Sequence, residues 1–215
     1  MTLCAPKMAA TSDHGKVNLL GLSQAALEAE ITALGLPKFR AGQLWRWVWR
    51  HGLTNFAEMS DLGKPVREQL TELFSADRPA VSRRLQSVDG TIKWLLRFAD
   101  GNEAEAVYIP DKERGTLCIS SQVGCTLTCS FCHPGTQKLV RNLTIAEICG
   151  QVLLAMDELN DWPSGKPGRR LTNIVLMGMG EPLFNYENVA TAMRIIMSGE
   201  GVAISKRRIT LSTSG

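Results

Sequence analysis

The sequence predicts an α/β protein in which a small helical N-terminal domain precedes a short antiparallel β section and a parallel β/α part. Apolar side chains recur at helical spacing over residues 22–76 and alternate between hairpin signals over residues 83–109. After that point strands alternate with helices, which favours a parallel sheet. The expected domains are a flexible tail at 1–17, a helical accessory domain at 18–78, and a β extension with the β/α part at 79–215.

Three helices are expected in the accessory domain. Ser23 is suited to cap the first helix, in which Leu27 and Ile31 fall on one face, and Gly35 followed by Pro37 ends it. The other two helices are expected at 40–51 and 65–74.

The β extension is predicted from two hairpin turn signals, Asp89-Gly90 and Asp100-Gly101. They separate strands expected at 83–88, 91–99 and 103–109. A further strand, expected at 116–120, runs straight into a cysteine-rich loop.

The β/α part begins with Thr144-Ile-Ala-Glu147, a capping box that opens a helix reaching about Asn160. The almost wholly apolar run 171–177 is typical of a parallel strand covered on both faces. A helix at 185–198 and a strand at 208–213 complete the pattern.

Composition sets the broad class. The chain has 215 residues, of which 44% are hydrophobic and 21% charged, as in ordinary soluble proteins. No apolar run approaches the roughly 18 residues that a membrane span needs, and residues 1–17 lack the apolar segment of a signal peptide. We therefore expect a cytoplasmic protein without a membrane partner. Its six cysteines should be reduced, and clustered cysteines in that compartment more often bind metal than form disulfides.

The loop after residue 120 carries the most specific motif, Cys125, Cys129 and Cys132 at the spacing C-x3-C-x2-C. An iron-sulfur cluster normally takes four thiolates. Three thiolates leave one iron of a 4Fe-4S cluster open, which is how radical S-adenosylmethionine (SAM) enzymes chelate the amino and carboxylate groups of SAM. Two alternatives remain. Zinc accepts three cysteines and a histidine, here His133, and free cysteines also pack as small hydrophobes.

Three expected strand ends carry unusual residues, and ligands gather at the carboxyl ends of parallel strands. They are the cysteine loop, Gly178-Met-Gly-Glu-Pro182 and Ser212-Thr-Ser-Gly215, which we expect on one rim. Glycines let a backbone pass close to a ligand, and Glu181 offers hydrogen bonds to an ammonium group. An ordinary glycine turn with a solvated glutamate, and turn-forming serines, are the alternatives.

Six short motifs together indicate one family. They are Val123–Cys132, Gly135-Thr-Gln, Arg141-Asn-Leu143, Gly178–Leu183, Asn185-Tyr186 and Thr210–Gly215. With them the sequence closely resembles the radical SAM adenine C2 methyltransferases of ribosomal and transfer RNA, from about Leu20 to the last residue. A relative that methylates carbon 8 of adenine is an alternative, as is a non-catalytic RNA-binding zinc module.

The resemblance implies about half of a partial (β/α)6 radical SAM barrel, and methylation of carbon 2 of adenine in 23S rRNA and tRNA through a methylated cysteine. It implies an electron donor such as flavodoxin and a monomeric state. Carried over by position, Cys125, Cys129 and Cys132 ligate the 4Fe-4S cluster, and Gly180, Glu181 and Ser212 contact SAM. Glu105 matches the family's acid/base glutamate, and Cys118 matches the cysteine that resolves the RNA adduct through a transient disulfide.

The family's methyl-carrying cysteine lies in its C-terminal region, and none of the six cysteines here is placed to substitute for it. The sequence therefore leads us to expect a fragment that does not turn over. The strand at 208–213 would also present an open edge.

An RNA surface has independent support from the second helix. Trp45, Trp47 and Trp49 interleave with Arg46 and Arg50, and cations with aromatic faces suit RNA. Because Trp45 and Trp49 are four residues apart, they share a helix face and some of these rings should be core. Lys206-Arg-Arg208 forms a second basic cluster, of a kind that is most often merely solvated.

Overall fold

The computed structural model describes residues 15–127, 129, 132 and 137–214. Most of the expected tail at 1–17 therefore lies outside the described residues, as does His133, the fourth ligand of the zinc alternative. Within the described ranges, no helix is long and apolar enough to cross a membrane.

The helical unit contains the three expected helices, α1 (Gln24–Ala33), α2 (Phe39–Trp49) and α3 (Lys64–Leu73). The predicted N-cap is confirmed, because the Ser23 Oγ accepts a hydrogen bond from the Ala26 N–H at 3.2 Å. Leu27 and Ile31 are buried as their shared face predicts. Burial of the apolar face of each helix against its neighbours holds the unit together.

Two short strands join the ends of this unit, and sequence reasoning missed them. β1 (Val17–Asn18) pairs in parallel with β2 (Phe74–Ser75). The prediction of a purely helical domain is therefore wrong in this detail. Strands of two residues are too short to leave a periodic signal in the sequence.

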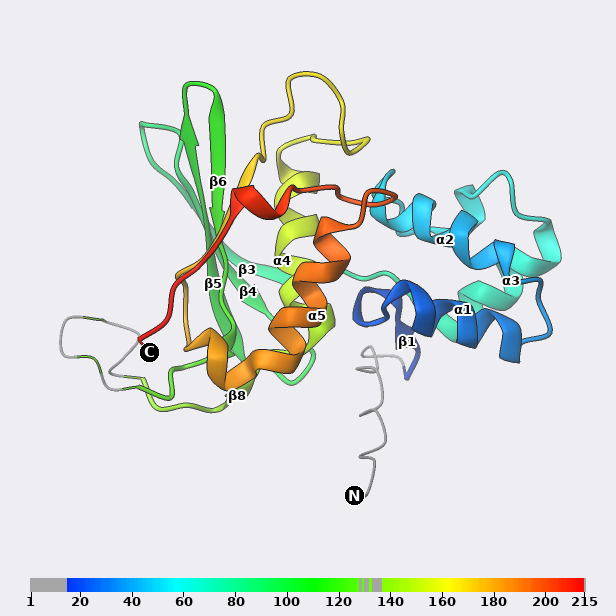
Figure 1. Ribbon diagram of the computed structural model, residues 1–215, viewed down its shortest axis with the longest axis horizontal. Helices are drawn as coiled ribbons and strands as arrows, with labels where there is room; N and C mark the ends of the chain where they lie inside the picture. Colours follow the sequence, from blue (N-terminus) through cyan, green and yellow to red (C-terminus); the bar gives the residue numbers. More distant parts are fainter. Residues whose placement is uncertain (1–14, 128, 130–131, 133–136, 215) are drawn as a thin grey trace.

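The second part of the molecule is built on a six-stranded mixed sheet (Figure 1). Its strand order is β10-β9-β6-β5-β4-β3. The hairpin-linked strands are antiparallel, whereas β9 lies parallel to both β6 and β10. The β extension and the parallel part are thus one continuous sheet. The strands are β3 (Ala80–Gln86), β4 (Ile92–Arg97), β5 (Glu103–Asp111), β6 (Arg114–Cys118), β9 (Asn173–Leu176) and β10 (Ile209–Leu211).

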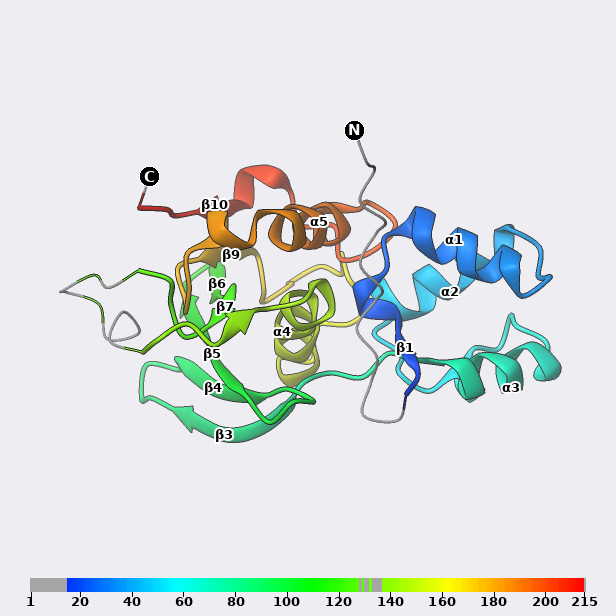
Figure 2. The ribbon, with the colours of Figure 1, turned by 90° about the horizontal axis from the view of Figure 1, so that it is seen from below.

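Two helices make the crossovers between the parallel strands, α4 (Ile145–Glu158) before β9 and α5 (Tyr186–Met197) before β10. The predicted capping box of α4 is present. The Glu147 N–H donates to Thr144 Oγ1 at 3.3 Å, and the Thr144 N–H donates to Glu147 Oε2 at 2.8 Å. Both helices lie against one face of the sheet (Figure 2).

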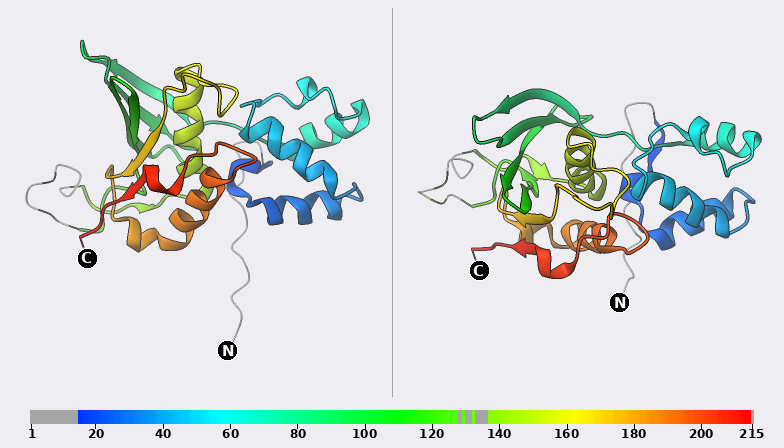
Figure 3. Two further views of the ribbon diagram at one scale, coloured as in Figure 1. Left: turned by 45° about the horizontal axis from the view of Figure 1, so that its top comes forward. Right: turned by 90° about the horizontal axis from the view of Figure 1, so that it is seen from above.

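Side-chain alternation separates the two faces of the sheet. Arg84 lies opposite Trp94 in the register and bonds Glu158 of α4, so Arg84 and the buried Trp94 are on the face that the helices cover. Leu95 is the next residue of β4 and therefore lies on the opposite face. Within the described ranges, no helix covers the other face (Figure 3), which we call the open face. Glu105 lies on it, opposite Leu95.

Candidate functional site

The three strand ends meet at one edge of the sheet, as the sequence predicts. The Met179 N–H donates to Ser120 Oγ at 2.9 Å, and the Ser121 N–H donates to the Met179 carbonyl at 2.8 Å, which joins the end of β6 to the end of β9. The Ser214 N–H donates to Glu181 Oε2 at 2.9 Å, which joins β9 to β10. We call this edge the rim.

The cysteine loop leaves the rim through a narrow base. β7 (Gln122–Val123) pairs with β8 (Arg141–Asn142), and the Cys125 N–H donates to the Gln137 carbonyl at 3.1 Å. The Leu127 N–H approaches Cys125 Sγ at 3.4 Å. N–H···S contacts of this kind help to set the reduction potential of iron-sulfur clusters.

The three cysteines of the motif are partly exposed free thiols. Among residues 15–127, 129, 132 and 137–214, no three His, Cys, Asp or Glu side chains lie close enough to hold one metal ion. Cys125, Cys129 and Cys132 are therefore not already arranged as a closed metal site. Their donor chemistry, three thiols on one loop with an N–H···S contact, fits a cluster held by three thiolates.

Both carboxylate oxygens of Glu181 accept hydrogen bonds from the protein, which the sequence did not indicate. Its side chain is buried, with Oε1 accepting from the Leu183 N–H at 3.0 Å and Oε2 accepting from Ser214. Burial acts to raise the pKa of the Glu181 carboxyl, but the hydrogen bonds from Leu183 and Ser214 outweigh it and leave the pKa below its usual value. Hydrogen bonds from the side chains of Thr213 and Ser214 also act to lower this pKa. The carboxylate, with about four acceptor positions, is therefore held as an anion by donors of the protein itself.

The glycines of this loop are explained by close approach to the continuation of β6. A Cβ on Gly178 would lie 2.7 Å from the Ile119 carbonyl oxygen. A Cβ on Gly180 would lie 2.5 Å from the Gln122 Cβ, and the φ of Gly180 is +97°. Only glycine fits both the space and the backbone conformation at position 180.

Buried polar side chains behind the rim were missed by sequence reasoning. Gln151 of α4 holds both backbone groups of Ser120, accepting from its N–H at 2.9 Å and donating to its carbonyl at 3.0 Å. Asn185 donates to the carbonyls of Ser121 and Leu143, at 2.8 and 2.7 Å. The only sequence signal of Gln151 is a polar residue beside apolar ones, which is too common to be diagnostic. Asn185 belongs to a motif that carries the resemblance, but no role was assigned to it.

Glu105 and Cys118 share the open face of the sheet. Cys118 pairs with Val107, which lies two residues beyond Glu105 on the same side of β5. The Glu105 carboxylate forms an ion pair with Lys93 Nζ at 2.6 Å, and its backbone carbonyl accepts from Ser120 Oγ at 2.6 Å. Burial raises the pKa of the Cys118 thiol above its ordinary value, against a smaller opposing effect of a backbone hydrogen bond at Met177. Ser212, after β10, is exposed.

The tryptophans of α2 mostly belong to the core, as their spacing indicates. Trp45 and Trp49 are each 1% exposed, with ring centroids 5.3 Å apart. Trp47 is half-buried and donates its Nε1–H to Asp61. Arg46 and Arg50 remain exposed, so an RNA surface on this helix would depend on its cations rather than on stacking.

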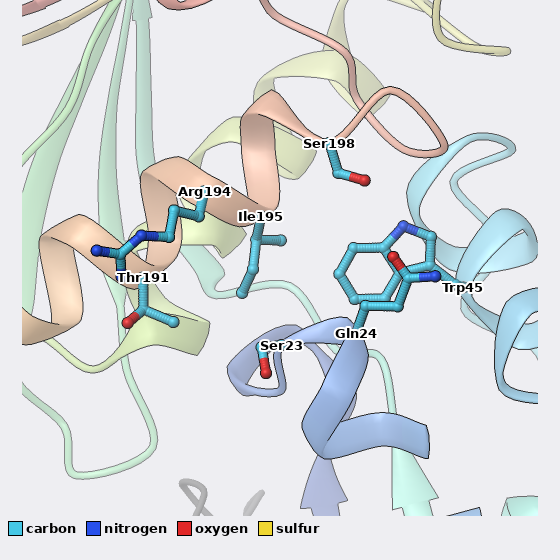
Figure 4. A pocket seen from close by; sticks show the side chains of 7 residues that line it. All are labelled: Ser23, Gln24, Trp45, Thr191, Arg194, Ile195 and Ser198. Carbon is cyan, nitrogen blue, oxygen red and sulfur yellow. The ribbon is translucent and has the colours of Figure 1, made fainter. Parts of the chain in front are cut away.

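A separate cavity of about 450 Å³ lies between α1, α2 and α5 (Figure 4). None of its lining residues belongs to the three strand-end motifs. They are Ser23, Gln24, Trp45, Thr191, Arg194, Ile195 and Ser198.

Comparison with known proteins agrees with the motifs at the rim. The family described as "Ribosomal RNA large subunit methyltransferase N-terminal domain" matches residues 17–75. The "Dual-specificity RNA methyltransferase RlmN" of Paramagnetospirillum magneticum is 57% identical over 209 residues, which cover 96% of this chain and 46% of that protein. The protein of the same name from Granulibacter bethesdensis is 57% identical over 217 residues, covering 99% of this chain and 54% of the relative. The chain is a relative of these RNA methyltransferases.

A solved structure extends the likeness to three dimensions. The radical SAM methyltransferase of Sphaerobacter thermophilus superposes with a TM-score of 0.82 and 42% identity, over 92% of this chain and 57% of that one. The resemblance predicted from the motifs and the α/β class are therefore confirmed. The chain spans about half the length of the curated relatives it matches.

Proposed function

We propose that this chain carries the cluster- and SAM-binding part of an RNA methyltransferase that acts on carbon 2 of adenine in 23S rRNA and tRNA. The observation that carries the proposal is the hydrogen-bonded rim, where the cysteine loop, the Gly178–Pro182 loop and the end of β10 meet. The parallel strands with α4 and α5 on one face support a partial radical SAM barrel, in which the open face is the inner one.

The roles follow from where each side chain lies. Cys125, Cys129 and Cys132 would hold a 4Fe-4S cluster, which when bound supplies the electron that cleaves SAM. Gly180 keeps its loop close to the cysteine loop, and Glu181, already ionised and fixed by backbone donors, would orient the ammonium of SAM. Ser212 lies beyond β10, where it would reach the ribose.

Two residues of the open face would act on the RNA base. Glu105 would hold or move a proton, and its place is fixed by the bond from Ser120 to its carbonyl. Cys118, as its thiolate, would attack the sulfur of the methyl-carrying cysteine in the RNA adduct. A disulfide would form between the two cysteines while the sulfur–carbon bond breaks, and the carbon left on the base would take the electron pair and a proton. The raised pKa of Cys118 means that it waits as a neutral thiol and has to lose its proton before it reacts.

The partners and the setting follow from the resemblance and belong to the same proposal. A cytoplasmic, monomeric enzyme would receive electrons from a protein such as flavodoxin. The exposed Arg46 and Arg50 of α2 would contact RNA phosphates.

Anaerobic reconstitution with iron and sulfide tests the cluster. We expect a brown protein with about four irons per chain and no bound zinc. The variant Cys129→Ala should lose most of that iron, whereas Cys149→Ala, which changes a buried thiol of α4, should keep it. A colourless protein that binds one zinc would favour the RNA-binding zinc module instead, and equal iron in both variants would contradict the ligand assignment.

Nucleoside analysis by mass spectrometry tests the reaction. Incubation with SAM, a reductant and 23S rRNA is followed by digestion, and the position of any new methyl group on adenine is read from standards. A methyl group at carbon 8 would contradict the proposed target. Because none of the six cysteines is placed to carry the methyl group, we expect no methylated adenine from this chain alone, and its appearance would contradict the need for a further cysteine.

A further inference from the structure

We propose that Gln122 is a positioning residue whose side-chain amide couples the cysteine loop to the Gly178–Pro182 loop, so that tight SAM binding depends on it. The inference rests on the proposed function, because it concerns the same cluster and SAM site. It goes further by assigning the geometry of that site to a residue that is neither a proposed cluster ligand nor a proposed SAM contact.

One buried amide contacts all the segments concerned. Gln122 is fully buried at the start of β7. Its Oε1 accepts from the Glu181 N–H at 3.0 Å, and from the Thr126 N–H and Oγ1 at 3.3 and 3.1 Å. Thr126 directly follows Cys125. Gln122 Oε1 therefore lies between the first cysteine of the motif and the proposed SAM glutamate.

The donor side of the same amide reaches the strand by which the cysteine loop returns. Gln122 Nε2 donates to Asn142 Oδ1 at 2.7 Å. Asn142 is itself oriented, because its Nδ2 donates to the Phe184 carbonyl at 3.1 Å. The side chain at position 122 must therefore offer an acceptor on one side and a donor on the other, which glutamine does and glutamate does not.

Backbone contacts make the coupling stiff. The Gln122 N–H donates to the Met179 carbonyl at 3.1 Å, and the space above the Gln122 Cβ is closed by Gly180. Neither loop can move relative to the other without breaking several of these contacts. A network in which each member is satisfied in this way fixes one geometry, and loss of one partner leaves buried groups unpaired.

Two variants separate the acceptor from the donor. Gln122→Met keeps the volume and removes every amide hydrogen bond, whereas Gln122→Glu keeps the acceptor and loses the donor to Asn142. Ser164→Ala is the control, because Ser164 is a buried residue that donates to the Gly201 carbonyl away from the rim. Iron content, the Kd for SAM by equilibrium dialysis, and the thermal midpoint are measured on each reconstituted protein.

We expect both Gln122 variants to hold as much iron as the wild-type chain. Gln122→Met should bind SAM about 10-fold more weakly, the effect of about 1.4 kcal/mol, and Gln122→Glu about 3-fold more weakly, because it loses only the bond to Asn142. Ser164→Ala should lower the thermal midpoint and leave the Kd unchanged. A wild-type Kd in folded Gln122 variants, or an equal change of Kd in Ser164→Ala, would overturn the proposal. Failure of the proposed function shows differently, because the wild-type chain would then bind no iron.

A variant at the exposed end of the network covers the case in which the Gln122 variants do not fold. Asn142→Ala removes the acceptor for Gln122 Nε2 and the bond from Asn142 Nδ2 to the Phe184 carbonyl, while Gln122 Oε1 keeps its donors, and Asn142 lies at the surface. We expect about a 3-fold increase in the Kd for SAM with unchanged iron content, the effect of one neutral hydrogen bond. An unchanged Kd in this variant would also overturn the proposal.

Discussion

Replacing Gly180 with alanine should destabilise the chain by about 1–5 kcal/mol, because backbone strain and steric overlap both oppose a side chain at this residue. A side chain at its φ of +97° costs about 1–2 kcal/mol. The new Cβ would also lie 2.5 Å from the Gln122 Cβ and 2.8 Å from the Gln122 backbone nitrogen, and overpacking of this kind costs about 1–3 kcal/mol. The lower entropy of the unfolded chain returns about 0.4–1 kcal/mol.

Two other glycines isolate the two costs. Gly101 has a φ of +81° with no atom within 4 Å of an added Cβ, so Gly101→Ala should cost only about 1 kcal/mol. Gly178 lies outside the left-handed region but its Cβ would meet the Ile119 carbonyl at 2.7 Å, so Gly178→Ala should show the steric cost alone, about 1–2 kcal/mol.

Urea unfolding of the three variants gives the free energy of unfolding of each. The loss in Gly180→Ala should be close to the sum of the losses in the other two, and larger by the unfolded-state term of about 0.4–1 kcal/mol that the sum counts twice. If Gly180→Ala were no less stable than Gly101→Ala, the loops would not be in contact and the reasoning about the rim would fail.

Three further predictions concern ionisation, an ion pair and RNA. Burial raises the pKa of the Cys149 thiol far above its ordinary value, so only the unfolded chain ionises it near pH 9. The free energy of unfolding should therefore fall as the pH rises above about 8.5, and Cys149→Ala should make that slope shallower but not remove it, because the pKa of Cys118 is raised too. Arg141→Lys should lose about 1–3 kcal/mol in urea unfolding, because lysine cannot reproduce the two 2.8 Å bonds to Glu147, and a change below 0.5 kcal/mol would contradict this. Replacing Arg46 and Arg50 with alanine should weaken RNA binding measured by fluorescence anisotropy and flatten its salt dependence, with stability changed by less than about 0.5 kcal/mol; an unchanged salt slope would exclude this surface.

Local signals in the sequence predicted most of the secondary structure. The N-cap at Ser23, the capping box at Thr144 and the two Asp-Gly turns each act over a few residues, and each is present in the structure. The meeting of three strand ends was also predictable, because parallel strands place their carboxyl ends together.

Contacts between distant segments were not predictable in the same way. Gln122 and Glu181 are 59 residues apart, and a glutamine next to a cysteine motif carries no sign of which backbone groups it will meet. The hydrogen bond from the Ser214 N–H to Glu181 Oε2 was missed for the same reason, since Ser214 is 33 residues away. The sequence indicates which residues carry chemistry, whereas the hydrogen bonds that orient them depend on tertiary packing.

The ion pair between Glu105 and Lys93 bears on how the proposed proton-transferring glutamate could become available for catalysis. The two side chains are 38% and 44% exposed and their charged atoms are 2.6 Å apart. Ion pairs at such exposure contribute only about 0–1 kcal/mol, so a polyanion that approaches the open face can draw Lys93 away at little cost. Glu105 itself is held by its backbone, through the bond from Ser120, rather than by its lysine partner. Under the role proposed for Glu105, the carboxylate would then keep its position while it loses its counter-ion, so that the approach of RNA makes it available as a base.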